Sequence, residues 1–145
     1  MSKDKKEKFI FLESIAVIII LLILVVISTS EIYKFILESK NSVVKSNARI
    51  AESEIHVAFI NKTDETINEI INDTVTELNN PDLLENSGDE TVSPYSSKNN
   101  IIPGFSTENK AKAGQVLIYY EPNSEISVKG YGKDKLIIER IILLK

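Results

Sequence analysis

Glu13 is the one charged residue in a long apolar run, and its chemistry is more tightly constrained than that of any other side chain here. Seventeen of the nineteen residues from Phe9 to Ile27 are apolar, and the two exceptions are the adjacent Glu13 and Ser14. A charged side chain in a membrane costs about 2.5–3.5 kcal/mol at mid-bilayer, and less near an end of the span. No lysine, arginine or histidine lies between residues 9 and 33 to offset this cost. We therefore expect Glu13 either to meet a cation from another chain or to reach the nearby membrane interface.

The rest of the sequence offers few residues for catalysis or cofactor binding. His56 is the only histidine, and its apolar neighbours Ile55 and Val57 on a predicted helix favour a structural role. There is no cysteine, no glycine-rich phosphate loop and no nucleophile elbow. Glu52 and Glu54 lie two residues apart, so they do not face each other on a helix. We expect no enzymatic activity, no metal and no cofactor.

Two further sets of polar residues, four carboxylates and three tyrosines, have simpler interpretations than a binding site. Four carboxylates between residues 82 and 90 lack the ligand spacing and central glycine of a calcium loop, which favours a solvated acidic loop. They are Asp82, Glu85, Asp89 and Glu90. Three tyrosines on predicted strands lie near carboxylates rather than in a basic groove, so we expect strand-face packing and no direct binding of nucleic acid. They are Tyr119, Tyr120 and Tyr131.

The apolar run has the length of a membrane span. As a helix, its nineteen residues extend roughly 28 Å, which is about the thickness of the hydrocarbon core of a bilayer. Four lysines precede it, and basic residues on a short flank predict a cytoplasmic N-terminus and an exported C-terminal part. A cleaved secretory signal is the alternative, because Ser28, Thr29 and Ser30 follow the run, but the length of the run and its glutamate favour an anchor.

The start of the apolar run resembles that of type IV pilins and pseudopilins. Phe9 and Glu13 occupy the first and fifth positions of the mature family sequence, ahead of an unbroken aliphatic stretch. The resemblance implies that a prepilin peptidase cuts between Lys8 and Phe9 and methylates the new amine. It also implies that Glu13 meets the N-terminus of a neighbouring subunit during filament assembly on a platform protein. The family has glycine before the cut, whereas this chain has Lys8.

Two functions agree with this N-terminal half. The first is a minor pilin-like or pseudopilin subunit of a filament used for adhesion, motility, secretion or DNA uptake. The second is an unprocessed single-pass scaffold protein with an extracytoplasmic domain, similar to septal division proteins, which would pair through residues 32–78. Coiled-coil pairing prefers bulky apolar seams. The apolar stripe of this segment contains three alanines, Ala48, Ala51 and Ala58, which favours the first function.

Beyond the membrane, the helical pattern continues. Neither glycine nor proline occurs before Pro81, and apolar residues recur at spacings of three and four. They are Val44, Ala48, Ala51, Ile55, Ala58 and Phe59. Thr66 and Glu69 fit a capping box, so the helix either breaks near residues 61–65 and restarts there or runs straight on to Leu78.

The C-terminal third predicts an antiparallel sheet. Three apolar stretches, 115–121, 126–129 and 135–144, are separated by turns at Pro122-Asn123-Ser124 and at residues 130–134. We expect an α+β fold in which the long helix, first transmembrane and then amphipathic, packs on this small sheet in a pilin-like layout. The segments are a basic leader 1–8, a transmembrane part 9–27, an amphipathic part 28–79, a variable loop region 80–114 and the sheet 115–145.

Overall fold

The structure is a computed structural model of the 145-residue chain, and it describes residues 3–80, 92–108, 112–121, 125–133 and 135–143. The chain divides into two compact units, Met1–Glu38 and Ser39–Lys145. The predicted acidic loop 82–90 and the predicted turn 122–124 lie outside the described residues. The described part of the first unit is entirely helical, and the second unit contains two helical segments and a sheet.

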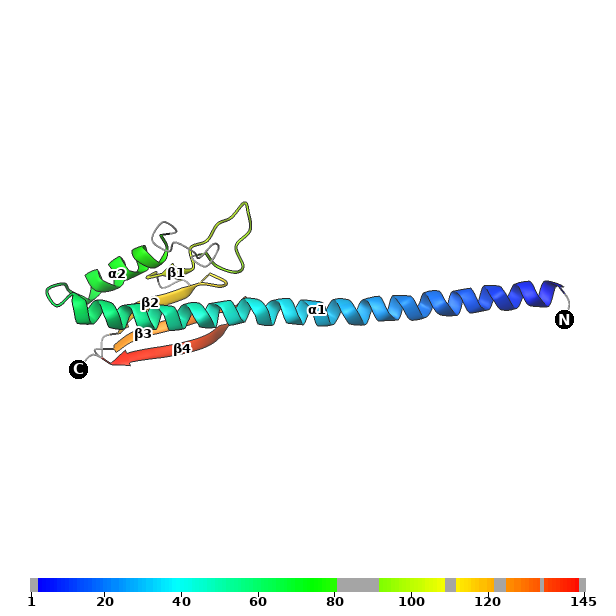
Figure 1. Ribbon diagram of the computed structural model, residues 1–145, viewed down its shortest axis with the longest axis horizontal. Coiled ribbons are helices and arrows are strands. Elements are labelled where there is room, and N and C mark those ends of the chain that lie inside the picture. The colour runs from blue at the N-terminus through cyan, green and yellow to red at the C-terminus, as the bar shows by residue number, and fades with distance from the viewer. Residues whose placement is uncertain (1–2, 81–91, 109–111, 122–124, 134, 144–145) are drawn as a thin grey trace. The chain divides into compact units, whose positions relative to one another are not determined.

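Helix α1 spans Lys3–Asn61 (Figure 1). Its continuity follows from the sequence, because no proline removes a backbone donor and no glycine adds backbone freedom within it. Residues 3–36 of α1 are exposed, whereas α1 carries a buried stripe in the second unit. This stripe consists of Val44, Asn47, Ala48, Ala51 and Ile55. Four of these five residues, all except Asn47, belong to the predicted stripe, and the periodicity of three and four explains why they share one face.

Helix α2 spans Ile67–Leu78 and begins with the capping box expected from the sequence. The backbone N–H of Thr66 donates to Oε2 of Glu69 at 2.8 Å, and the N–H of Glu69 donates to Oγ1 of Thr66 at 3.4 Å. These two bonds satisfy backbone donors that the first helical turn leaves without partners. Of the two arrangements left open by the sequence, the structure has a break after Asn61 and a second helix.

The sheet has four strands in the order β1-β2-β3-β4. Strands β2 (Val116–Glu121), β3 (Glu125–Tyr131) and β4 (Leu136–Leu143) pair antiparallel, as the three apolar stretches predicted. Strand β1 (Phe105–Ser106) instead pairs parallel with β2. The expectation of a purely antiparallel sheet is therefore wrong, and the sheet is mixed. The reason is that β1 lies in the stretch assigned to the loop region and is only two residues long, which is too short for an alternating pattern.

Asn79 holds β1 in place beside α2. Its side-chain amide donates from Nδ2 to the carbonyl oxygen of Phe105 at 2.9 Å, and its Oδ1 accepts from the N–H of Phe105 at 3.1 Å. The amide group thus reproduces the pair of hydrogen bonds that a neighbouring strand would make. Asn79 is also the C-cap residue of α2, so one residue links the end of the helix to the start of the sheet.

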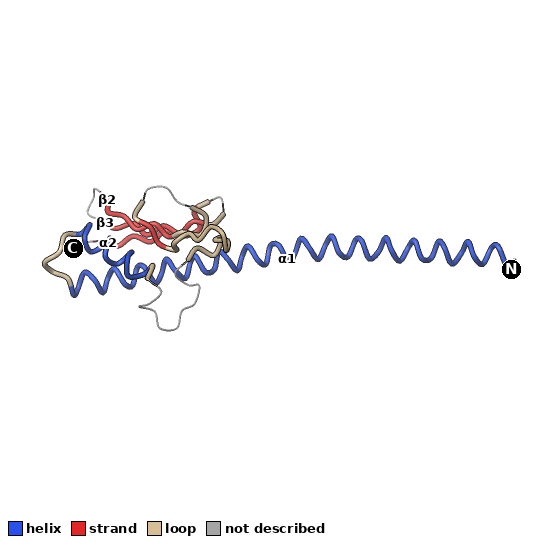
Figure 2. Tube along the Cα trace, turned by 90° about the horizontal axis from the view of Figure 1, so that it is seen from above, coloured by secondary structure: helices blue, strands red, loops and turns tan. Residues whose placement is uncertain are grey.

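The core of the second unit lies between one face of the sheet and the two helices (Figures 1 and 2). It combines the buried stripe of α1, the inner face of α2 and alternate residues of the strands. The strand residues are Phe105, Val116, Ile118, Ile126, Val128 and Ile142. Gly130 on β3 permits the close approach of α1, because an added Cβ would lie 2.9 Å from Cγ1 of Val44 and 2.7 Å from Cγ2 of Ile138. The architecture is α+β, as expected.

Candidate functional site: the apolar half of α1

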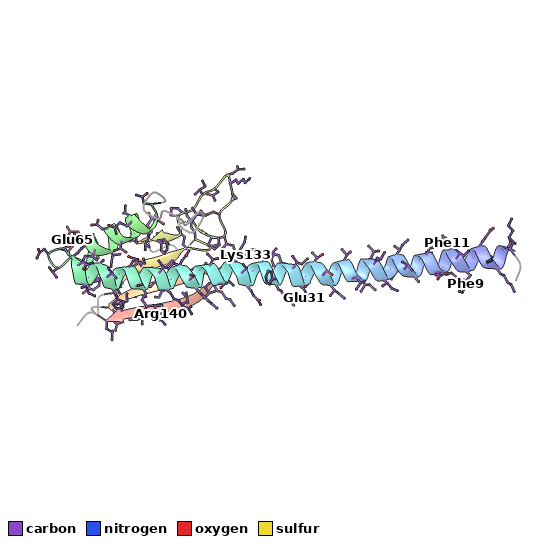
Figure 3. The ribbon with its side chains drawn as sticks, viewed as in Figure 1. Phe9, Phe11, Glu31, Glu65, Lys133 and Arg140 are labelled. Atoms are coloured by element: carbon purple, nitrogen blue, oxygen red, sulfur yellow. The ribbon has the colours of Figure 1, made fainter. Side chains whose placement is uncertain are left out.

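The N-terminal part of α1 presents large apolar side chains on all its faces. The residues from Phe9 to Ile27 are all exposed, with Phe9 at 64% and Phe11 at 67% (Figure 3). In the part of the chain that the structure describes, α1 is the one helix long and apolar enough to cross a membrane. A helix that is apolar all round requires either a lipid environment or other protein to cover it. This segment is therefore compatible with a membrane anchor.

The hydroxyl group of Ser14 within this segment, and those of Ser28 and Thr29 just after it, are bonded to the helix itself. Ser14 donates to the carbonyl oxygen of Ile10 at 2.9 Å. Ser28 and Thr29 make the same bond to the carbonyls four residues earlier, each at 2.7 Å. Because each of these hydroxyls already donates its hydrogen to a backbone carbonyl, it needs no other hydrogen-bond acceptor in an apolar medium.

Glu13 differs from these hydroxyls because it has no partner. Between residues 9 and 29, all of which the structure describes, it is the only polar side chain that makes neither a hydrogen bond nor an ion pair. Phe9 lies four residues earlier, so the two residues are on the same face of the helix. The arrangement leaves one carboxylate available to a cation from outside the chain.

Lys8 and Phe9, the predicted processing junction, both lie within α1, which begins at Lys3. Both side chains are exposed, and neither makes a hydrogen bond or ion pair with a described residue. The structure thus brings Phe9 and Glu13 together on one helical face, with Lys8 at the adjoining position.

A charged cluster on the sheet was not anticipated from the sequence. Lys129 on β3 donates to the hydroxyl of Tyr119 on β2 and lies 3.2 Å from the carboxylate of Glu139 on β4. The hydrogen bond to Tyr119 raises the pKa of Lys129, and the contact with Glu139 acts in the same direction. Because the three residues come from three adjacent strands, their alignment depends on strand register, which the sequence alone does not provide. The cluster stabilises the sheet and leaves Lys129 charged.

The described residues contain no group of three or more histidine and carboxylate side chains that could hold a metal ion. His56 is exposed on α1. Tyr120 packs against the core, as expected for a strand-face residue. Comparison of the chain with protein-family models, with curated proteins and with solved structures finds no match.

Proposed function

We propose that this protein is a minor type IV pilin-like or pseudopilin subunit, anchored in the cell membrane by the first half of α1. In this proposal the N-terminus is cytoplasmic and the second unit is extracytoplasmic. The observation that carries the proposal is the unpartnered Glu13 in an apolar segment whose one hydroxyl, that of the adjacent Ser14, is bonded to the helix. A carboxylate in this position is stabilised by a cation, and the chain supplies none between residues 9 and 33.

The cation proposed here is the amino group that cleavage before Phe9 would create on a neighbouring subunit. That amine would sit at the start of an apolar helix, at a depth similar to that of Glu13. Two opposite charges in one apolar bundle cost far less when paired than when separate. Pairing between copies would therefore select a defined arrangement of helices in a filament.

The second unit gives additional support. A helix packed through a narrow stripe on one face of a small sheet agrees with the layout that the N-terminal resemblance implies. Membrane lipid, other pilin-like subunits, a prepilin peptidase and an assembly platform protein are the proposed partners. The filament would serve adhesion, motility, secretion or DNA uptake.

The test is an intact-mass measurement combined with a Glu13 variant, using the full chain expressed in cells that contain a prepilin peptidase and filament assembly proteins. We expect a mature chain beginning at Phe9. Glu13→Val should block incorporation into filaments while membrane insertion is unchanged or improved, because a charge has been removed from the span. Ser14→Ala is the matched control, since it removes one internally bonded hydroxyl and leaves the charge in place.

Either of two results would overturn the proposal. Retention of residues 1–8 in such cells would remove the amine that Glu13 is proposed to meet, and would favour the single-pass scaffold function. Normal assembly of the Glu13→Val variant would remove the role proposed for the carboxylate.

A further inference from the structure

In the second unit, α1 carries an exposed uncharged stripe in addition to its buried one. We call this the seam; it consists of Ser39, Val43, Ser46, Ile50, Ser53, Val57 and Ile60. The apolar members remain open to solvent: Val43 and Ile50 are 38% exposed and Val57 is 47% exposed. No member carries a charge, although lysine, arginine and glutamate occur on the remaining exposed surface of the same segment.

The spacing of the seam is that of a coiled coil. Val43, Ile50 and Val57 are seven residues apart, and each is followed three residues later by Ser46, Ser53 or Ile60. These are the a and d positions of a heptad, and the β-branched residues at every a position are those found at a in two-stranded coiled coils, although serine rather than leucine occupies two of these d positions. A strict seven-residue repeat keeps its residues facing a partner helix that winds around the first with a left-handed twist.

The sheet leaves this seam accessible. In the same heptad, the buried residues Val44 and Ala51 fall at b, Ala48 and Ile55 fall at f, and Asn47 falls at e. Position f is the farthest from the a/d contact, so the sheet is packed mainly on the side of α1 opposite the seam. Helix α1 can therefore pack on its own sheet through one face and contact a second helix through the seam.

The charges flanking the seam are complementary between two parallel copies. Arg49 occupies a g position and Glu54 the following e position, which are neighbours across a parallel coiled coil. Both side chains are exposed, and neither makes an ion pair with any residue in the described ranges. In an antiparallel pair, g would face g and e would face e, which would place like charges together at matched positions.

From the heptad spacing, the exposed seam and these charges, we propose that residues 39–60 of α1 pair with the same segment of a second copy, parallel and in register. Serines at the d positions allow close approach of the two helices but contribute little apolar burial. We therefore expect weak pairing that a shared membrane anchor strengthens by raising the effective concentration. This pairing needs neither cleavage before Phe9 nor Glu13, so it goes beyond the function proposed above.

Disulfide cross-linking of the full chain in membranes tests the pairing directly, because the natural sequence has no cysteine. Same-residue disulfides require Cα atoms within about 7 Å, which in-register pairing provides at a and d positions. Under mild oxidation, Ile50→Cys and Ser46→Cys should give several-fold more covalent dimer than Lys45→Cys. Lys45 is the matched control, since it is exposed and adjacent to Ser46 but lies at position c. Equal dimer yields at positions 45 and 46 would overturn the proposal.

Charge exchange tests the direction and register of pairing. In the Ile50→Cys background, Arg49→Glu or Glu54→Arg should lower the dimer yield, and the double variant should restore it. A double variant that stays as low as the single variants would contradict parallel, in-register pairing.

A second comparison separates this pairing from filament assembly. With Glu13→Val added, the cross-link at Ile50→Cys should persist even where filaments are lost. Loss of the cross-link together with the filaments would show that the seam contacts arise only within filaments, and would overturn independent pairing.

Discussion

Arg140 on β4 donates a hydrogen bond from Nε to Oε2 of Glu52 on α1 at 2.8 Å, and this ion pair joins residues 88 positions apart in the chain. The hydrogen bond and the charge of Glu52 both raise the pKa of Arg140. The ion pair links β4, the last strand of the sheet, to α1, which packs on the sheet.

Glu52→Gln should therefore lower the melting temperature of the second unit slightly, because the bond loses its charge while its geometry is retained. The melting temperature of the full chain in detergent is the measurement. Glu108→Gln is the control, since Glu108 is an exposed carboxylate whose side chain makes no ion pair with a described residue. Equal melting temperatures for the two variants would contradict a stabilising role.

Ile55 is fully buried between α1 and the sheet, so its truncation should leave a cavity. Ile55→Ala is expected to reduce the free energy of unfolding of the second unit by about 2–5 kcal/mol. Denaturant titration in detergent, followed by a probe of β-structure, measures the loss. His56→Ala, at the exposed neighbouring position, should change the same quantity by less than about 0.5 kcal/mol. A loss at Ile55 no greater than that at His56 would contradict the packing described.

The capping box of α2 makes stability depend on pH in acid. Hydrogen bonds donated by the backbone N–H and the hydroxyl of Thr66 lower the pKa of Glu69 below its ordinary value. A carboxylate with a depressed folded-state pKa stabilises the fold above its unfolded value of about 4.3, and this contribution disappears as pH falls through the folded-state value.

Wild type should accordingly be more stable than Glu69→Gln at neutral pH, and the difference should shrink below about pH 4. Hydrogen exchange of the α2 amides, measured across this range in both proteins, provides the readout. A difference that stays constant from neutral to acidic pH would rule out the charge as its origin.

Lys8 occupies the position where the family that the N-terminus resembles has glycine. If a prepilin peptidase processes this chain, Lys8→Gly should increase the fraction cleaved before Phe9, because a small residue replaces a long charged one at the junction. Intact-mass spectrometry of the membrane fraction gives that fraction directly. Lys6→Gly removes the same charge two residues earlier and should leave cleavage unchanged. An equal effect of the two substitutions would indicate a response to charge alone.

Much of the fold follows from local sequence patterns. The absence of breakers before Pro81 predicted the long helix, the Thr66 and Glu69 spacing predicted the capping box, and the three apolar stretches predicted β2, β3 and β4 within one or two residues. The parallel strand β1 was missed because it is only two residues long, and because Asn79, whose side chain bonds to it, is 26 residues away from Phe105 in the chain. No local pattern contains that information.

The candidate site was predictable in part. Glu13 stands out by its charge in an apolar run, and the resemblance to pilins added Phe9, whereas their exposure on one face of α1 comes from the structure. The seam was missed for a different reason. Two apolar stripes run along α1 between residues 39 and 60, and periodicity cannot decide which of them the sheet covers. The structure buries the stripe containing Ala48 and leaves the one containing Ile50 open.

The amide of Asn79 has one further consequence, which concerns how the sheet could grow. At the β1 margin, the main-chain groups of Phe105 are already saturated by a side chain of the same molecule. At the opposite margin, β4 is paired with β3 alone in the described part of the chain. A polypeptide adding a strand to the sheet would therefore find the N–H and carbonyl of Phe105 already hydrogen-bonded, whereas the outer edge of β4 has no strand beside it among the described residues.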